Sequence, residues 1–540
     1  MTNRYTLGQL TEESWARHDD YESLFFEGTW YRSQQLAQRA RRLTGGFIEL
    51  GVLPGDRVVV LMANCPEVGL TYSALWRAGA IVTPVVFLVS EEELKHVLAD
   101  SGARVVVTTP DWIPKVDAAS STVAGLDITV VVAGELPPPS GQEAAGEAGS
   151  AAAAASAPSR RVALSDLERA AEAPVVDREP GDLAAVMYTG GTTGRAKGVM
   201  LTNEGLWRVG KASYDQAHIP GINRVLVPLP LSHSYGLIVT LVGMHSEEKG
   251  VNVLQRWFDA KQWLALVSEH GVQQSTVVPA MLQLLLAEPA LDEVKLPDLR
   301  YLTSGAAPLP GEVREEIERR IPGVQVLEGY GLTETCAVTA VNPPGRRKIG
   351  SVGLPLPCYQ VVVRDDDGNV LPAGHDGEIC VRGNSLMRAY WNSPDATAAA
   401  LSEIDGVHEL RTGDIGRLDE DGYLYIVDRK KDLIIRNGFN VYPRDVEDAL
   451  VEHPDVHMAG VVGRPDPKVG EEIVAFVMPR WGATGKVSEL AAFARERLAA
   501  NKYPREIRVL DMLPMTSVGK LDRKKLREMA RDSAQQPGRE

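Results

Sequence analysis

The chain has 540 residues, of which 44% are hydrophobic and 24% are charged, a composition typical of soluble globular proteins. Its formal net charge of −15 argues against a general nucleic-acid binder, because no broad basic field is available to neutralise phosphates. A chain of this length is too long for one compact core, so we expect two or more domains.

The first quarter of the chain alternates helix-like and strand-like segments. Apolar residues recur at helical spacing over residues 33–50. Short apolar runs at 57–61, 80–82, 105–107 and 129–132 are typical of strands. This alternation predicts an α/β domain with a largely parallel sheet.

Residues 134–161 differ from their surroundings. They are rich in Pro, Gly, Ser, Glu and Ala and have no apolar period, so we interpret them as a solvated, mobile surface insert. The alanine run at 151–155 leaves a helix as the alternative, since Ala is the best helix former.

A Gly-rich stretch, TGGTTGRAKG, runs from Thr189 to Gly198 and follows a short apolar run at 183–188 that predicts a buried strand. Its glycines let the backbone approach an anion, its threonines offer hydroxyls, and Lys197 adds positive charge, which suits a polyphosphate. An ordinary hairpin is the simpler alternative. A Walker loop is excluded, because Gly198 rather than Ser or Thr follows Lys197.

Further motifs follow the Gly-rich stretch, and each of them alone has a simpler explanation as a turn, a core residue or a surface charge. They are the proline-flanked segment 228–237 around His233, the small-residue turn at 303–309, the run EGYGLTET at 328–335, the segments RTGD at 411–414 and DRKKD at 428–432, and the run PMTSVGK that ends at Lys520.

Taken in order from Ala185 to Lys520, these motifs resemble those of the adenylate-forming enzymes. This superfamily comprises acyl-CoA synthetases, peptide-synthetase adenylation domains and beetle luciferases, and the chain is most similar to fatty-acid or aryl-acid CoA ligases. Members more often carry Pro where this chain has Ala196, a departure that keeps the neighbouring Lys197.

The resemblance implies two domains joined by a hinge. A large N-terminal domain of α/β sheet subdomains would span residues 1–428, and the hinge would span 429–432 with Lys431 as its pivot. A smaller, mobile α+β domain would span 433–540 and carry the catalytic lysine.

The resemblance also implies a site for MgATP. Tyr330 would stack on adenine, Thr333 would contact phosphate, Glu334 would bind Mg²⁺, and Asp414 assisted by Arg429 would hold the ribose hydroxyls, roles that suit these residue types. The implied nucleotide-binding residues are Thr189, Gly190, Gly191, Thr192, Thr193, Gly194, Lys197, Gly305, Ala306, Ala307, Tyr330, Gly331, Thr333, Asp414, Arg429 and Lys520. The implied catalytic residues are Lys520, Glu334, Thr189, Lys197 and His233.

An acyl pocket and a thiol channel complete the implied site. The pocket residues are His233, Ser234, Tyr235, Gly236, Val278, Gly305 and Gly331, and the channel residues are His233, Arg436, Asn437, Gly438 and Phe439. Members that activate amino acids carry Asp where this chain has Ser234. A hydroxyl cannot balance a buried ammonium group, so we expect an acid that is not an amino acid. The candidate pocket segments 235–239, 241–244 and 277–281 are predominantly apolar and favour a hydrophobic carboxylic acid.

The implied reaction joins a carboxylic acid to a thiol through an acyl adenylate, with ATP, Mg²⁺ and coenzyme A. Coenzyme A is the expected acceptor because the chain ends about one helix after Lys520 without an appended carrier domain. A free-standing ligase that loads an acyl carrier protein is one alternative, and a non-catalytic nucleotide-binding protein that acts by interaction is another. The sequence leaves the oligomeric state open, a homodimer included.

Cysteine use and targeting signals bear on the compartment. The four cysteines are widely spaced, with no paired spacing for zinc or a disulfide framework. The N-terminus lacks an apolar signal core, no run approaches the roughly 20 apolar residues of a membrane span, and the last residues are not a peroxisomal address. We therefore expect a cytoplasmic protein without a membrane span.

Overall fold

The structure is a computed structural model that describes residues 5–123, 125–136, 160–189, 195–437, 439–480, 483, 485–515 and 521–532. By internal packing the described residues fall into two compact units. The first unit holds the residues up to 189 together with 195–360 and 382–410, and the second holds 361–381 and the residues from 411 onward. The predicted division at the hinge 429–432 stays a prediction.

The first unit contains a seven-stranded sheet. Its strands, in spatial order, are β7 (Arg160–Ala163), β6 (Thr129–Val132), β5 (Val105–Thr108), β3 (Arg57–Leu61), β4 (Ile81–Pro84), β8 (Leu183–Thr189) and β9 (Lys197–Thr202). All neighbours are parallel except β8 and β9. The predicted strands and the predicted parallel sheet are confirmed.

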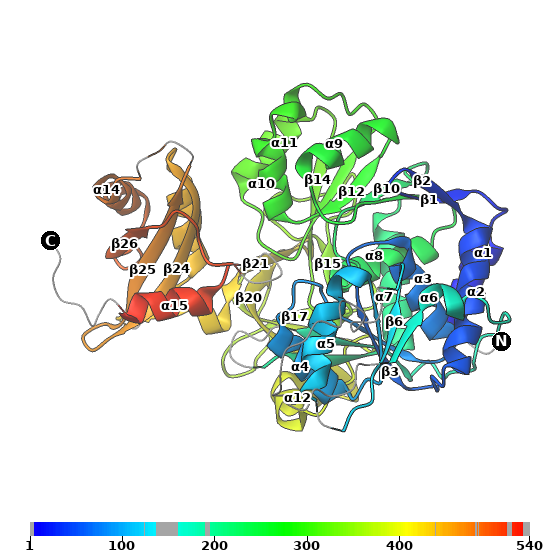
Figure 1. Ribbon diagram of the computed structural model, residues 1–540. Helices are drawn as coiled ribbons and strands as arrows, with labels where there is room; N and C mark the ends of the chain where they lie inside the picture. Colours follow the sequence, from blue (N-terminus) through cyan, green and yellow to red (C-terminus); the bar gives the residue numbers. More distant parts are fainter. Residues whose placement is uncertain are drawn as a thin grey trace, which may run out of the picture. The chain divides into compact units, whose positions relative to one another are not determined.

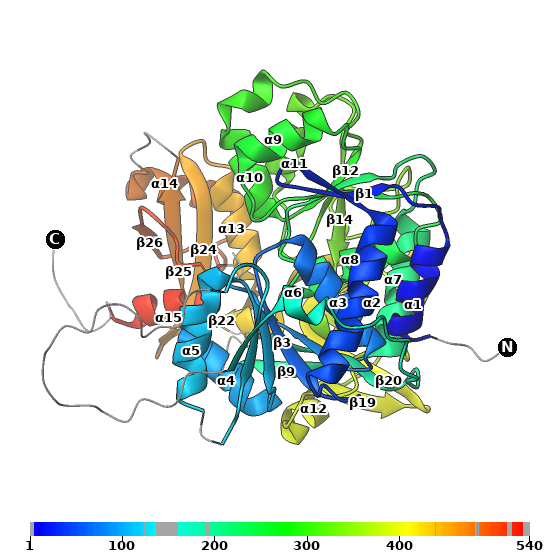
Figure 2. The same ribbon diagram turned by 45° about the vertical axis from the view of Figure 1, so that its right-hand side comes forward.

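Helices cover this sheet because its strands are apolar on both faces. Helices α4 (Glu91–Ser101) and α5 (Ile113–Ser121) lie together beside it in both views (Figures 1 and 2). Their apolar side chains, such as Leu94 and Val116, share one buried cluster with Val59 and Val106 of the strands. The predicted helix at 33–50 is α2 (Ser33–Glu49), which packs on α3 (Pro66–Arg77).

A nine-stranded sheet forms the rest of the frame of the first unit. Its strands, in spatial order, are β16 (Leu354–Pro355), β15 (Ala340–Val341), β14 (Gln325–Tyr330), β13 (Tyr301–Ser304), β12 (Gln274–Val277), β10 (Arg224–Val227), β11 (Val251–Leu254), β1 (Glu22–Phe26) and β2 (Thr29–Arg32). The strands from β14 to β1 are parallel, and the antiparallel strands lie at the two ends.

Three helices pack on one face of this sheet, α9 (Ala260–Glu269), α10 (Pro279–Ala287) and α11 (Gly311–Arg320) (Figure 1). The other helical segments of the first unit are α1 (Leu7–Ala16), η1 (Pro110–Trp112), α6 (Leu164–Leu167), α7 (Asn203–Ala217), α8 (Ser234–Met244), η2 (Pro289–Asp292), η3 (Thr333–Thr335) and α12 (Pro394–Ala400).

Two further five-stranded sheets follow along the chain. One has the order β17 (Gln360–Arg364), β18 (Gly377–Arg382), β20 (Val407–Leu418) and β19 (Leu401–Ile404), with β21 (Leu424–Arg429) paired to β20. The other, within the second unit, has the order β23 (Phe439–Val441), β22 (Ile434–Arg436), β25 (Gly470–Pro479) and β24 (Val456–Asp466), with β26 (Glu506–Val509) paired to β25. The second unit also holds η4 (Lys430–Asp432), α13 (Pro443–Val451), α14 (Val487–Arg497) and α15 (Arg523–Asp532).

The predicted insert at 134–161 lies mostly outside the described residues. Arg160 and Arg161, which the prediction placed in the insert, instead begin strand β7 and pair with Thr129 and Val130 of β6. Within the described part of the chain, no helix has the length and apolar character needed to cross a membrane.

Close helix packing in the first unit gives a stability test. A Cβ at Gly45 of α2 would lie 2.1 Å from the carbonyl oxygen of Ala171, whereas a Cβ at Gly69 of α3 would meet no atom within 4 Å. We expect Gly45→Ala to lower the free energy of unfolding by about 1–3 kcal/mol through overpacking. We expect Gly69→Ala to be neutral or to stabilise by about 0.5–1 kcal/mol, because Ala is the better helix former. Urea unfolding of both variants measures this, and similar midpoints for the two would contradict it.

Candidate active site

Four neighbouring parallel strands of the nine-stranded sheet, β10, β12, β13 and β14, end at one edge. Their register puts Val277 beside Ser304 and Ser304 beside Glu328, so the segments that follow begin side by side. In open α/β sheets such a carboxyl edge is where ligands bind. The segments that follow these strands contain the predicted residues His233, Val278, Gly305, Ala306, Ala307, Gly331, Thr333 and Glu334.

The His233 segment is fixed by the start of α8. His233 caps this helix, and its Nδ1 accepts a hydrogen bond from the backbone N–H of Tyr235 at 3.2 Å. The Tyr235 hydroxyl donates to the carbonyl of Thr303 at 3.0 Å, and Thr333 Oγ1 donates to Ser234 Oγ at 3.3 Å. The first turn of α8 is therefore hydrogen-bonded both to β13 and to the segment around Thr333. These bonds join three predicted site motifs that are far apart in the sequence.

The small-residue turn after β13 is tightly built. Ala306 has a φ of +68°, a left-handed conformation that is uncommon for a residue with a side chain and is typical of functional sites. A Cβ at Gly305 would lie 3.4 Å from the Tyr235 ring and 3.4 Å from the Gly329 carbonyl, which is ordinary contact. A Cβ at Gly331 would lie 1.9 Å from the carbonyl oxygen of Ala337, so only glycine fits there.

Glu334 sits in the short helix η3 and is held by a residue that the sequence analysis missed. The Tyr390 hydroxyl donates to Glu334 Oε1 at 2.7 Å, and the backbone N–H of Met387 donates to the Glu334 carbonyl at 2.8 Å. Burial raises the pKa of Tyr390, and the Glu334 carboxylate raises it further, so the phenol keeps its proton at neutral pH and donates. The ring of Tyr390 also faces Lys197, whose Nζ lies 4.9 Å from the ring centroid.

The two ends of the Gly-rich stretch are adjacent, because Thr189 and Lys197 are register partners on β8 and β9. The stretch thus connects two antiparallel strands, and its polyphosphate role stays a prediction since residues 190–194 lie outside the described residues. Helix α4 supports both ends. Asp100 accepts a hydrogen bond from the Tyr188 hydroxyl at 2.7 Å, and His96 Nε2 donates to the carbonyl of Ala196 at 2.8 Å.

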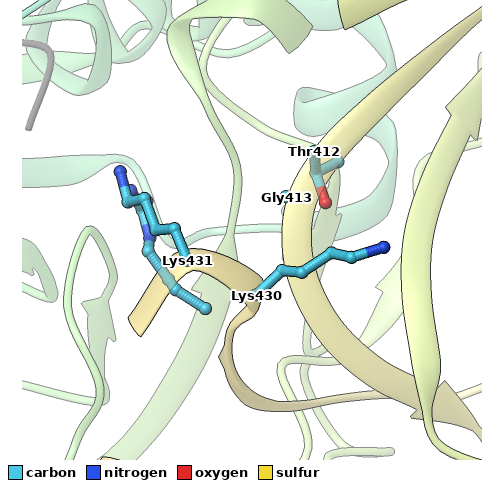
Figure 3. Close-up of a pocket in the computed structure, with 5 residues that line it drawn as sticks. Thr412, Gly413, Lys430 and Lys431 are labelled. Carbon is cyan, nitrogen blue, oxygen red and sulfur yellow. The ribbon is translucent and has the colours of Figure 1, made fainter. Parts of the chain in front are cut away.

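In the second unit the predicted ribose residue is paired. Asp414 is 3% exposed, and its Oδ1 lies 3.0 Å from Nε of Arg429, its register partner on β21. Arg429 also lines a pocket of about 310 Å³ with Thr412, Gly413, Lys430 and Lys431 (Figure 3). The cationic side chains in this lining suit an anionic ligand group.

The predicted hinge residues are anchored by charge within the second unit. Lys430 Nζ lies 2.9 Å from Asp366 and 3.2 Å from Glu378. Burial acts to raise the pKa of Glu378, but hydrogen bonds from Arg411 and Lys430 outweigh it and hold the pKa below its usual value. Lys431 leaves the same turn in a different direction from Lys430 (Figure 3).

Asp432, the last residue of the predicted hinge, is buried and bonded to α15. Its Oδ1 accepts a hydrogen bond from Arg527 at 2.5 Å, and Arg523 Nε lies 3.6 Å from its other oxygen. Helix α15 begins three residues after Lys520, which itself lies outside the described residues.

The predicted thiol-channel residues belong to the hairpin β22–β23. Arg436 is buried and forms a two-point ion pair with Glu472, at 2.8 and 3.2 Å. Phe439 is 58% exposed. Asn437 has a φ of +51° at the turn, and Gly438 lies outside the described residues.

No cluster of three or more His, Cys, Asp or Glu side chains suited to a metal occurs among the described residues. Mg²⁺ does not need one, because it usually binds through one or two carboxylates together with substrate phosphates and waters. Tyr390 donates to only one oxygen of the Glu334 carboxylate. The donor set at Glu334 therefore fits Mg²⁺ bound together with a polyphosphate.

Sequence reasoning missed Tyr390, His96 and Asp100 because their partners are 56 to 100 residues away. The one signal in the sequence is the Tyr390–Trp391 aromatic pair, which lies in a segment without helical or strand periodicity.

Comparison with known proteins gives a consistent result. The AMP-binding enzyme family matches residues 11–391, and the AMP-binding enzyme C-terminal domain matches residues 445–520. A long-chain-fatty-acid–CoA ligase of Bacillus subtilis is 34% identical over 546 residues, covering 97% of this chain and 94% of that protein. A sulfoacetate–CoA ligase of Cupriavidus necator is 35% identical over 500 residues, covering 91% of each. A crystal structure of ATP-bound MatB from Rhodopseudomonas palustris has a TM-score of 0.84 at 30% identity, covering 97% of this chain and 99% of that chain.

A glycine near the strand ends gives a test of the site. We expect Gly331→Ala to weaken ATP binding more than tenfold, since its Cβ would displace the Ala337 carbonyl and with it the turn that carries Thr333 and Glu334. A Cβ at Gly311, which begins α11 and belongs to no predicted site, would meet no atom within 4 Å, so we expect Gly311→Ala to keep ATP affinity within about threefold of the original chain. Calorimetric titration with ATP, alongside a melting curve for each variant, measures both. Equal ATP affinities in the two variants would show that the Gly331 turn does not shape the nucleotide site.

Proposed function

The chain belongs to the family of AMP-binding enzymes and is an AMP-forming acyl-CoA synthetase, and from this premise we propose that it activates a hydrophobic carboxylic acid that is not an amino acid. The observation that supports the proposal best is the shared edge of β10, β12, β13 and β14. The segments predicted to bind the carboxylic acid, the adenine base and the triphosphate all follow strands that end at this edge.

The proposed reaction has two steps. In the first, a carboxylate oxygen of the acid attacks the α-phosphorus of ATP, the bond from this phosphorus to the bridging oxygen breaks, and pyrophosphate leaves. In the second, the thiolate of coenzyme A attacks the acyl carbonyl carbon of the adenylate and AMP leaves. Both steps depend on orientation and charge stabilisation more than on a general base.

We assign each predicted site residue a role in these two steps. Lys197 and the adjoining Gly-rich stretch would hold the leaving pyrophosphate, and Lys520 would bridge the carboxylate and the α-phosphate. Tyr330 would stack on adenine, while Asp414 with Arg429 would accept and donate hydrogen bonds at the ribose. Lys431 would be the pivot for the second step, in which His233 and the hairpin from Arg436 to Phe439 would line the thiol passage.

Mg²⁺ would be held by Glu334, where it supplies positive charge that neutralises the triphosphate. The chain's contribution is to hold this carboxylate in place through the Tyr390 hydroxyl.

The class of acid follows from Ser234. This side chain is 7% exposed, and its oxygen accepts the hydrogen bond of Thr333. A buried hydroxyl cannot neutralise an ammonium group, whose desolvation would cost several kcal/mol. An amino acid would therefore bind poorly, and an acid with an apolar body would gain ~25 cal/mol for each Å² of surface that it buries.

Similarity alone does not decide the acid. Relatives at 34% and 35% identity act on a long-chain fatty acid and on sulfoacetate, which differ in both size and charge. The buried hydroxyl of Ser234 therefore supports the proposed class of acid. For the acceptor, relatives named as CoA ligases support coenzyme A over a carrier protein.

A panel of acids tests the proposed substrate class. We expect AMP and pyrophosphate release, with acyl-CoA identified by mass spectrometry, to be fastest with medium or long fatty acids or aryl acids. Acetate, sulfoacetate and amino acids should be slower by at least tenfold, since they bury little apolar surface or bring an unpaired charge. Faster turnover of any of these polar acids than of every apolar acid would contradict the proposal.

The two half-reactions test the role of Lys520. We expect Lys520→Ala to slow acid-dependent adenylate formation by about 100-fold or more, because only this transition state needs its charge. Thioester formation from acyl adenylate supplied ready-made should stay within about threefold of the original chain. The exposed Lys524 of α15 provides the matched control, and Lys524→Ala should change neither step. Equal loss of both steps in Lys520→Ala would refute this assignment.

A further inference from the structure

Residues 387–391, which we term the bridging segment, join two parts of the first unit that are predicted to handle the triphosphate. On one side the segment pairs with β9, through hydrogen bonds from Arg388 N–H to Met200 O at 2.8 Å and from Trp391 N–H to Gly198 O at 2.7 Å. On the other side, the N–H of Met387 donates to the carbonyl of Glu334 at 2.8 Å. The bridging segment therefore fixes the position of the β9 backbone relative to the η3 backbone.

Tyr390 repeats this connection with its side chain. Its hydroxyl donates to Glu334 Oε1 at 2.7 Å, and its ring lies under the ammonium group of Lys197, 4.9 Å from Nζ to the ring centroid. The backbone at Tyr390 is itself bridged to Val199, two residues after Lys197. One neutral residue therefore contacts both an anion and a cation.

Because Tyr390 is neutral, it does not cancel the charge of Lys197 or of Glu334. Among the described residues, neither Lys197 nor Glu334 lies within 4.0 Å of an oppositely charged side chain. A lysine or arginine in place of Tyr390 would orient Glu334 but would also neutralise it. A phenol orients the carboxylate through a hydrogen bond and the ammonium through its ring face, and it leaves both formal charges available to a ligand.

We propose that Tyr390 is a positioning residue for metal-bound ATP, which holds Glu334 toward the metal through its hydroxyl and Lys197 toward the phosphates through its ring. This inference rests on the proposed roles of Glu334 and Lys197. The two contacts are separable by substitution, because phenylalanine keeps the ring and loses the hydroxyl, whereas leucine loses both.

Measurements of ATP affinity with and without Mg²⁺ distinguish the hydroxyl contact of Tyr390 from its ring contact. The affinity of the full-length chain for ATP is measured by calorimetry with saturating Mg²⁺ and again with a chelator and no divalent metal. We expect Tyr390→Phe to weaken Mg²⁺-dependent ATP binding by about tenfold, the effect of one hydrogen bond to a charged group, and to leave metal-free binding unchanged. We expect Tyr390→Leu to weaken ATP binding under both conditions, because Lys197 then loses its ring contact.

A matched control comes from the second unit. Tyr425 donates a hydrogen bond to Asp419 Oδ2 at 3.2 Å, so Tyr425→Phe also removes a phenol–carboxylate bond. It should leave ATP affinity unchanged with and without Mg²⁺. Melting curves for all variants report folding, and if Tyr390→Leu does not fold, Tyr390→Phe still decides the hydroxyl contact.

A double-mutant cycle isolates the hydroxyl. Glu334→Gln removes the carboxylate charge, and we expect Tyr390→Phe to have no further effect on Mg²⁺-dependent affinity in that background, since the two residues act through one contact. Additive losses would overturn the proposal. So would a Tyr390→Phe variant whose Mg²⁺-dependent affinity equals that of the original chain, or one that loses metal-free affinity to the same extent.

Acid-dependent pyrophosphate release by the original chain is measured in parallel. Its absence with every acid would refute the proposed function, whereas the binding data judge Tyr390 by themselves.

Discussion

The site depends on one geometrical constraint, that neighbouring parallel strands end at the same edge. Because β10, β12, β13 and β14 are adjacent and in register, four chain segments separated by up to about 100 residues begin side by side, each about 5 Å from the next. Side-chain bonds then connect these segments, as between Ser234 and Thr333. The left-handed backbone at Ala306 and the close approach of Gly331 to Ala337 are the local cost of bringing them together.

The elements of the fold were readable from the sequence where a periodicity was strong. Helix α2 and strand β3 have nearly the limits that their apolar patterns predict, and β12 to β14 carry the predicted motifs at their ends. Local pattern determines such elements because each buries one stripe or both faces of its own residues. The site residues were predicted from the family resemblance, which rests on the order of the motifs and not on the physical properties of single residues.

The contacts that organise the site were not readable in this way. Tyr390 and Glu334 are 56 residues apart, and His96 and Ala196 are 100 apart, so no local pattern links them. They become neighbours only once strand order is known, and strand order in a parallel sheet is set by long crossovers rather than by local sequence. The same reason explains why residues 361–381 pack with the chain beyond 411, which no composition shift signals.

Two segments of the chain are flanked by residues that pair with each other, and this pairing has a consequence for sequence variation. Thr189 is paired with Lys197, and Met515 forms an isolated bridge with Leu521, so both loops that carry predicted catalytic charge start and finish at adjacent positions. The entropic cost of closing a loop changes by only about 0.6 kcal/mol when its length doubles. Insertions or deletions between the paired residues would therefore cost little stability and would leave the paired residues where they are. Natural or engineered variation in length can accumulate at these two places in the chain without a change of fold.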